Sequence, residues 1–340
     1  MTAIRIERLN KTFEVKKKQP GLAGSLRSLW KPVYEQKQAV SGISFSVQQG
    51  EMLAFLGPNG AGKSTTIKML TGILHPTSGQ AEVLGCNPWK ERNKLAYRIG
   101  SVFGQKSQLW YHLPPADTFE LMRHMYELPR GDYLARKEEL VRRFELEPYW
   151  NTPVRKLSLG ERMRCEIAVS LLHRPRIVFL DEPTIGLDVV VKLNIRELIR
   201  DMNREEGMTV FLTSHDAGDV EQLCERAIVV NHGRMILDDK VASMKRELLT
   251  YKTIRLIMAD EHGLAAVNIP GAEVKAHEGV KVTLSVNTSR IPIEAVLARL
   301  VGQVRIRDVT IEDPPMEEVI THIYAQAGAD ASEGQGGEPA

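Results

Sequence analysis

The chain has 340 residues, a length typical of about two domains. Its 45 Lys and Arg nearly balance 43 Asp and Glu, and the net charge of +2 gives no broad basic surface for nucleic acid or anionic lipid. No apolar run approaches the roughly 18 residues of a membrane span, and the N-terminus lacks a secretory leader pattern. Cys86, Cys165 and Cys224 have no disulfide or metal spacing, so we expect a reduced, cytosolic protein in which they are packing residues.

The first segments of the chain alternate apolar and polar residues. This alternation predicts strands at Ile4–Ile6 and at Ile43–Val47. Between them, residues 15–37 are interpreted as an insertion, in which the leucines and Trp30 of 22–30 have the spacing of a short amphipathic helix. Two roles stay open for it: a solvated loop that packs on its own domain, or a contact with a membrane surface or membrane partner.

The region from Glu51 to about Asp239 consists of short apolar runs separated by helical segments. The runs are Met52–Leu56, Ile99–Phe103, Ile177–Leu180, Thr209–Thr213 and Ala227–Val230. Continuous apolar strands between helices predict an α/β fold with a mainly parallel sheet covered on both faces. Helical periodicity over Pro115–Glu147 adds an inserted helical subdomain at about 106–172, so that residues 1–239 form one domain.

The chain changes character after Lys240. Alternation predicts strands at Thr253–Met258, Lys281–Val286 and Val304–Ile311, and Ile293–Leu300 is helical in pattern. Residues 240–326 are therefore predicted to form a small α/β accessory domain, which either binds a regulator or supports a dimer and packs on the first domain. The tail, 327–340, has no large apolar residue, and we expect it to be disordered.

The strongest motif is a glycine-rich loop between a predicted strand and a predicted helix. The segment GPNGAGKS fits the pattern G-x-x-x-x-G-K-[ST], whose backbone N–H groups and following helix N-terminus bind phosphate. Lys63 would reach the β and γ phosphates, and the Ser64 hydroxyl would bind Mg²⁺. The predicted nucleotide-binding residues here are Gly57, Pro58, Asn59, Gly60, Ala61, Gly62, Lys63, Ser64 and Thr65.

Two carboxylates follow the apolar strand Ile177–Leu180. Asp181 fits the acidic residue that holds Mg²⁺, and Glu182 is placed to polarise the attacking water. Such a pair is common at strand ends, but together with the phosphate-binding loop it predicts hydrolysis of a nucleotide.

Just upstream of these carboxylates, LSLGE at Leu157–Glu161 resembles the LSGGQ signature of ATP-binding cassette (ABC) ATPases. Gln105, the loop Ile185–Asp188 and His215 also fall where this family has its motifs. The segment that begins at Glu312 looks like the C-terminal extension of bacterial efflux-type members. The resemblance implies a P-loop NTPase cassette with a mixed, mainly parallel core sheet and an inserted helical subdomain.

In the family that the chain resembles, two cassettes meet head to tail, and each ATP lies between the phosphate loop of one and the signature of the other. The chain carries one cassette, so the resemblance implies a second one from another chain, most simply in a homodimer. Ser158, Gly160 and Glu161 would then complete the γ-phosphate site in trans, and Asp188 would link the two sites. Leu159 and Glu161 depart from the usual Gly and Gln, but Gly160 is retained, so we expect a working site.

The resemblance also implies the remaining roles around ATP. Glu182 would be the general base and His215 a γ-phosphate contact. Gln105 would contact Mg²⁺ or water and sense a membrane partner. Phe13 matches the aromatic residue on which adenine stacks, the alternative being a residue of the core.

The predicted function is that of the ATP-binding and hydrolysing subunit of a multi-subunit transporter, peripheral on the cytoplasmic face of the membrane, with separate permease subunits. Export is preferred over import only through the C-terminal resemblance, and the substrate is not indicated. Trp110 and Tyr111 either contact the permease or pack within the helical subdomain. We expect no nucleic-acid partner.

Two other functions fit the sequence less well. A soluble ABC ATPase that acts on ribosomes or nucleic acid is the alternative, but the chain has one cassette and no long coiled coil between Lys63 and Arg155. A regulatory module without turnover is disfavoured because Lys63, Asp181, Glu182 and His215 are all present.

Overall fold

The computed structural model describes residues 1–17, 34–104, 107–214, 216–248, 251–259, 271–313, 316, 318–321 and 323–324. The chain divides into two compact units, Met1–Asp238 and Asp239–Ala340. The helix expected within 22–30, the residues Gln105 and His215, and the tail 327–340 lie outside the described residues.

A six-stranded sheet forms the centre of the first unit, in the order β5-β6-β7-β3-β8-β9. Its strands are β3 (Met52–Leu56), β5 (Ile99–Phe103), β6 (Ile177–Asp181), β7 (Thr209–Ser214), β8 (Arg226–Asn231) and β9 (Arg234–Lys240). β3 pairs in parallel with β7 and β8, and β6 pairs in parallel with β5 and β7. The loops that follow β3, β6 and β7 therefore gather at one edge of the sheet.

A second, antiparallel sheet has the order β2-β1-β4, with β1 at Thr2–Lys16, β2 at Tyr34–Gln48 and β4 at Ser78–Val83. β1 and β2 stay paired as far as Lys16 opposite Tyr34, so both ends of the predicted 15–37 insertion are strand rather than loop. The sequence did not indicate these strand ends, because the first five residues of β2 are all exposed and show no alternation.

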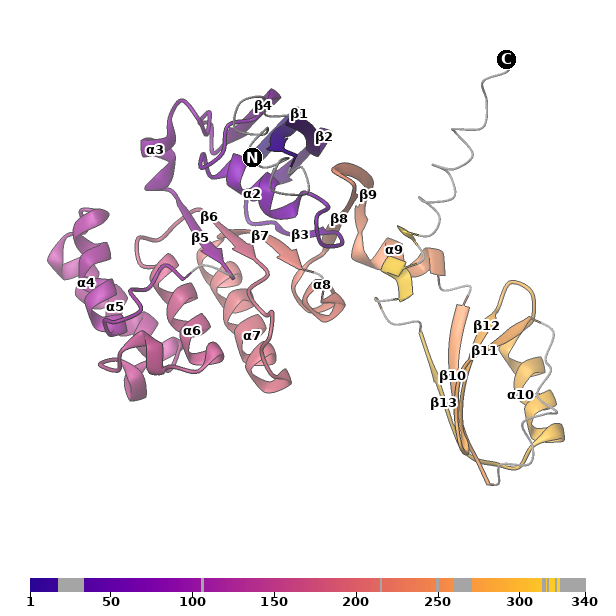
Figure 1. The fold of residues 1–340 in the computed structure, drawn as a ribbon. Coiled ribbons are helices and arrows are strands. Elements are labelled where there is room, and N and C mark those ends of the chain that lie inside the picture. The colour runs from indigo at the N-terminus through magenta and orange to yellow at the C-terminus, as the bar shows by residue number, and fades with distance from the viewer. Residues whose placement is uncertain are drawn as a thin grey trace, which may run out of the picture. The chain divides into compact units, whose positions relative to one another are not determined.

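The two faces of the six-stranded sheet are covered by different elements. The antiparallel sheet and α2 (Lys63–Leu70) lie on one face, and α6 (Leu159–Ser170), α7 (Val189–Glu206) and α8 (Ala217–Leu223) lie on the other (Figure 1). At the first interface, the Phe45 ring of β2 lies 6.2 Å from the Phe211 ring of β7 and 5.7 Å from the Phe55 ring of β3, measured between centroids. A mostly parallel sheet covered on both faces is the architecture that the apolar strands predicted, and it fixes the loops at the sheet edge.

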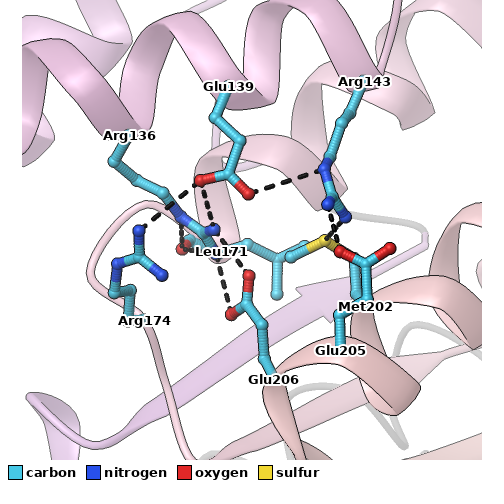
Figure 2. Close-up of polar contacts among 8 residues, drawn as sticks. All are labelled: Arg136, Glu139, Arg143, Leu171, Arg174, Met202, Glu205 and Glu206. Carbon is cyan, nitrogen blue, oxygen red and sulfur yellow. Dashed lines mark hydrogen bonds and ion pairs between the residues drawn. The ribbon is translucent and has the colours of Figure 1, made fainter.

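The helical region contains α4 (Pro115–Met125), α5 (Arg130–Arg143) and the short turns η1 (Glu147–Tyr149) and η2 (Val154–Lys156), and it leads into α6. The short helix α3 (Arg92–Ala96) precedes β5. Arg136 joins α5 to the end of α7, because its guanidinium donates to both Glu206 carboxylate oxygens, at 2.6 and 3.0 Å (Figure 2).

The second unit contains a four-stranded antiparallel sheet in the order β11-β12-β10-β13. Its elements are α9 (Val241–Leu248), β10 (Tyr251–Met258), β11 (Ala272–Glu278), β12 (Lys281–Asn287), α10 (Ile293–Gln303) and β13 (Ile306–Glu312). Val296 and Leu300 of α10 pack against the sheet residues Leu256 and Leu284. Across the described part of the chain, no helix combines the length and apolar character that crossing a bilayer requires.

Candidate nucleotide-binding site

The phosphate-binding motif forms the loop between the buried strand β3 and helix α2. Gly62 caps α2 in the left-handed region, with φ 101°, and a Cβ at this position would lie 2.4 Å from the Ala39 carbonyl oxygen. Only glycine fits both constraints, and the resulting turn leads into the N-terminus of α2, where backbone N–H groups attract anions.

Motif residues that are far apart in sequence meet at this edge of the sheet. The Lys63 Nζ donates to the Gly57 carbonyl oxygen at 2.6 Å and lies 3.4 Å from the Glu182 Oε1. The Ser64 hydroxyl donates to the Asp181 Oδ1 at 3.1 Å. The Lys63 side chain is only 5% exposed, so water and salt weaken the charge interactions of its ammonium group very little.

Thr213 is a site residue that the sequence did not indicate. Its hydroxyl donates to the Asp181 Oδ1 at 2.6 Å and accepts from the Glu182 backbone N–H at 3.2 Å. The same N–H donates to the Thr213 carbonyl oxygen at 3.0 Å, and Glu182 has a left-handed backbone with φ 55°. Thr213 therefore orients both acidic residues, and its one sequence signal is a polar residue ending an apolar strand.

A pocket of about 440 Å³ opens beside the loop. It is lined by Phe13, Val15, Lys37, Ala39, Pro58, Asn59, Gly60, Gly62, Lys63, Ser64, Thr65 and Glu182. Phe13 is half-buried, with the Lys11 Nζ 5.1 Å from its ring centroid, so it is not a residue of the core. A larger hollow of about 640 Å³ runs along β4, but no described motif residue borders it.

The signature segment begins helix α6. The Ser158 Oγ accepts from the Glu161 backbone N–H at 3.3 Å, and the Glu161 Oε2 accepts from the Ser158 N–H at 2.8 Å, which completes a capping box. The Glu161 carboxylate thus stabilises the start of α6. A Cβ on Gly160 would lie 2.8 Å from a Val191 methyl group, so the signature packs closely on α7.

Asp188 caps α7, since its carboxylate accepts from the Val191 N–H at 3.0 Å. Among the described residues, Asp188, Ser158, Gly160 and Glu161 all lie outside the lining of the pocket beside Lys63. One chain therefore presents the phosphate loop and the signature at separate places.

Two predicted residues, Gln105 and His215, fall outside the described part of the chain, but their neighbours are defined. The segment after 106 is anchored to α6, because the Glu166 carboxylate accepts from the Ser107 hydroxyl and from the Gln108 N–H. Burial raises the pKa of Glu166, and these hydrogen bonds oppose the rise. Trp110 and Tyr111 are 42% and 58% exposed, so they are surface residues rather than packed ones.

A phosphate loop between a strand and a helix, with two carboxylates at the end of a neighbouring parallel strand, defines the class of P-loop nucleotide hydrolases. Within this class, the signature at the start of α6 points to the ABC ATPases that the sequence resembles. Comparisons with known proteins support the same assignment. The family model described as ABC transporter matches residues 40–185. The ATP-binding protein NatA of Bacillus subtilis is 34% identical over 63% of this chain and 88% of its own length.

Other relatives match most of the chain. The linearmycin resistance ATP-binding protein LnrL of Bacillus subtilis is 31% identical over 86% of this chain and 96% of the relative. The daunorubicin resistance ATP-binding protein DrrA3 of Streptomyces coeruleorubidus is 31% identical over 85% of this chain and 92% of its own length. The chain belongs to the ABC transporter ATP-binding family, and it is an ATP-binding and ATP-hydrolysing subunit of that kind.

Solved structures give the same fold. The ATP-binding cassette MJ0796, in a dimeric post-hydrolysis state bound to ADP and Pi, has a TM-score of 0.59 and 26% identity, and the match covers 70% of this chain and 98% of that one. CbiO1 from Clostridium perfringens, part of the transporter complex cbiONQ, has a TM-score of 0.58 and 27% identity, with coverage of 73% and 94%.

Proposed function

We propose that this subunit hydrolyses ATP at the pocket beside Lys63 to drive export through separate permease subunits on the cytoplasmic face of a membrane. The meeting of Lys63, Ser64, Asp181 and Glu182 at one edge of the sheet carries the proposal. A γ-phosphate bound at the loop would attract the Lys63 ammonium, and the Glu182 carboxylate at the same edge is placed to polarise the attacking water. His215 and Gln105 keep the γ-phosphate and Mg²⁺ or water contacts that the family resemblance implies.

The residues at this edge fit a magnesium ion. The Ser64 hydroxyl and the Asp181 carboxylate are 3.1 Å apart, and Mg²⁺ is typically held by one or two such oxygens together with substrate phosphates. No group of three or more His, Cys, Asp or Glu among the described residues forms a separate metal cage. The ion would neutralise charge that develops on the phosphate oxygens.

A homodimer would complete the site. The signature lies outside the pocket in its own chain, so a two-fold copy would bring Ser158 and Gly160 to the phosphate. The surface around the signature suits such a contact, because four exposed apolar side chains lie at the starts of α6 and α7: Leu159, Val189, Val190 and Leu193.

Exposed Trp110, Tyr111 and Leu113 form a surface suited to a permease. Their segment is tied to the residues before the signature, since the Arg155 N–H donates to the Tyr111 carbonyl oxygen at 3.0 Å and the Val154 N–H donates to that of Leu113 at 3.1 Å. Export is supported by the names of the relatives, which include resistance proteins and a Nod factor export protein of Ralstonia nicotianae.

Glu182→Gln tests the hydrolytic site. Loss of the general base is expected to lower kcat by roughly 100-fold or more, while the Kd for Mg-ATP stays near that of the wild type. Phosphate release and binding of a fluorescent ATP analogue measure the two quantities. Glu197→Gln, the same change at an exposed position of α7, is the control and should retain full turnover. Unchanged turnover in Glu182→Gln would remove Glu182 from its proposed role.

A further inference from the structure

A fully buried carboxylate, Asp219 of α8, lies close to the proposed ATPase site without lining its pocket. Its Oδ2 accepts hydrogen bonds from two hydroxyl groups, those of Thr184 and Ser214, each at 2.6 Å. Its Oδ1 accepts from the Arg196 Nε at 2.7 Å. A buried charge is costly to the fold unless it is paired in this way, and a satisfied buried network holds its members rigidly.

The two hydroxyls belong to the two loops that carry the proposed catalytic groups. Thr184 stands two residues after Glu182, in the loop that follows β6. Ser214 is the last residue of β7 and directly precedes position 215. A single oxygen atom of Asp219 therefore ties the loop of the proposed general base to the loop of the proposed γ-phosphate contact.

A second anchor lies on the other side of position 215. Asp216 accepts hydrogen bonds from the Lys192 Nζ at 2.5 Å, from the Arg196 Nη2 at 3.1 Å and from the Gly218 N–H at 2.9 Å. Burial favours a higher pKa for Asp216, but the hydrogen bond and charge of Lys192, the charge of Arg196 and the Gly218 hydrogen bond together lower the pKa. Arg196 thus joins both flanks of position 215, through Asp216 and through Asp219.

We propose that Asp219 is a positioning residue for ATP hydrolysis: it sets the spacing of the loops that carry Glu182 and residue 215. The proposal rests on the hydrolytic role proposed for those two residues. A displacement of about 1 Å can slow an enzyme roughly 100-fold without disturbing the chemistry of any single group. Loosening this link should therefore reduce kcat while the phosphate loop, which Asp219 does not touch, still binds ATP.

Thr184→Val breaks the link without leaving an unpaired charge, because valine keeps the shape of threonine and Asp219 stays paired with Arg196 and Ser214. We expect kcat to fall about 10-fold while the Kd for Mg-ATP changes less than about 3-fold. Thr184→Ser retains the hydroxyl group, and its kcat should lie within about 3-fold of the wild type. A general packing defect would not be rescued by the smaller serine.

Ser214→Ala removes the second half of the link. Because both hydroxyls act through the same oxygen, Ser214→Ala combined with Thr184→Val should lower kcat little more than the worse single variant. If the fold-decrease in kcat of the double variant equals the product of the two single decreases, the two hydroxyls act independently and the shared link is contradicted.

Glu206→Ala is the matched control for stability, since it disrupts a different buried ion pair at the far end of α7. It should lower the unfolding midpoint and leave kcat unchanged. Wild-type kcat in Thr184→Val, an equal loss in Thr184→Ser, or a kcat loss in Glu206→Ala that follows stability would each overturn the positioning role. Glu182→Gln, assayed alongside, separates the two proposals: if it keeps full turnover, the proposed function fails, and if it alone loses turnover, only the role of Asp219 fails.

Discussion

His173 is a largely buried histidine held in its neutral form. Its Nε2 donates to the Ile99 carbonyl oxygen at 2.9 Å, and its ring stacks on Tyr126 with the centroids 3.8 Å apart. The Nδ1 atom has no hydrogen-bond partner among the described residues. Burial lowers the pKa of His173 from its ordinary value of 6.5 to about 4, so a proton here would be poorly accommodated.

This depressed pKa predicts acid sensitivity. Between about pH 6.5 and pH 4 the unfolded chain binds a proton at residue 173 and the folded chain does not, so the free energy of unfolding falls as the pH is lowered through this window. Between pH 7 and pH 5, His173 is expected to account for about 2 kcal/mol of the decrease in the free energy of unfolding. Urea unfolding at both pH values measures this decrease. His173→Gln can still donate to the Ile99 carbonyl oxygen, and its stability should decrease between the two pH values by that much less than the stability of the wild type. An equal loss in both proteins would contradict the buried neutral histidine.

Residues of the candidate site differ in how far the sequence indicates them. Lys63 and Asp181 belong to spaced motifs, and the structure brings them to one edge of the sheet. Thr213 and Asp219 are isolated polar residues whose importance depends on which strands are neighbours. Strand order is a tertiary property, so no local pattern could have indicated their hydrogen bonds.

At the level of helices, the attachment of α5 to the end of α7 depends on a charged cluster. Arg136 is 2% exposed, pairs with Glu206 and Glu139, and donates to the Leu171 carbonyl oxygen. Arg143 of the same helix pairs with Glu205 (Figure 2). Removing one partner of such a buried pair lowers the free energy of unfolding, because the remaining charge stays buried without a counter-charge.

Glu206→Ala is expected to lower the free energy of unfolding by roughly 2–3 kcal/mol, somewhat below the full cost of a broken buried pair because Glu139 still contacts Arg136. The double variant Arg136→Met/Glu206→Ala should lose less free energy of unfolding than Glu206→Ala alone, because methionine fills the space of the arginine without a buried charge. Chemical denaturation of the wild type and these two variants measures the two losses. A double variant less stable than Glu206→Ala would show that the arginine contributes by packing rather than as a stranded charge.

Strands with a buried face were predictable, whereas of the mostly exposed strands β13 was predicted, at Val304–Ile311, and β4 and β11 were not. The alternation of Thr253–Met258 and Lys281–Val286 predicted β10 and β12, which the structure confirms. β11 shows no alternation because every residue after Ala272 is exposed, and it was missed. β4, whose first three residues are all exposed, was missed for the same reason.

In the whole molecule, the proposed homodimer predicts that apolar residues at the start of α7 are buried on ATP binding. Val190 is 66% exposed in the single chain. On the Glu182→Gln background with Mg-ATP, Val190→Asp should weaken dimerisation by roughly 10-fold or more, because it places a charge in an apolar contact. Sedimentation velocity measures the dimer fraction.

The matched control is Val301→Asp, at a valine of α10 that is 71% exposed in the second unit. It should leave the dimer unchanged. Equal dimerisation of Val190→Asp and its parent would exclude the surface around Val190 from the dimer contact.

The central claim is that ATP hydrolysis here serves a membrane transporter, and isolation of the assembled complex tests it most directly. Tagged Glu182→Gln protein would be purified with Mg-ATP from detergent-solubilised cells of its own host, beside a Tyr111→Asp variant that disrupts the exposed aromatic surface. We expect mass spectrometry to identify polytopic membrane proteins with the first protein and a clear loss of them with the second. Recovery of ribosomes or DNA-repair proteins, with no membrane subunits, would contradict the transporter function.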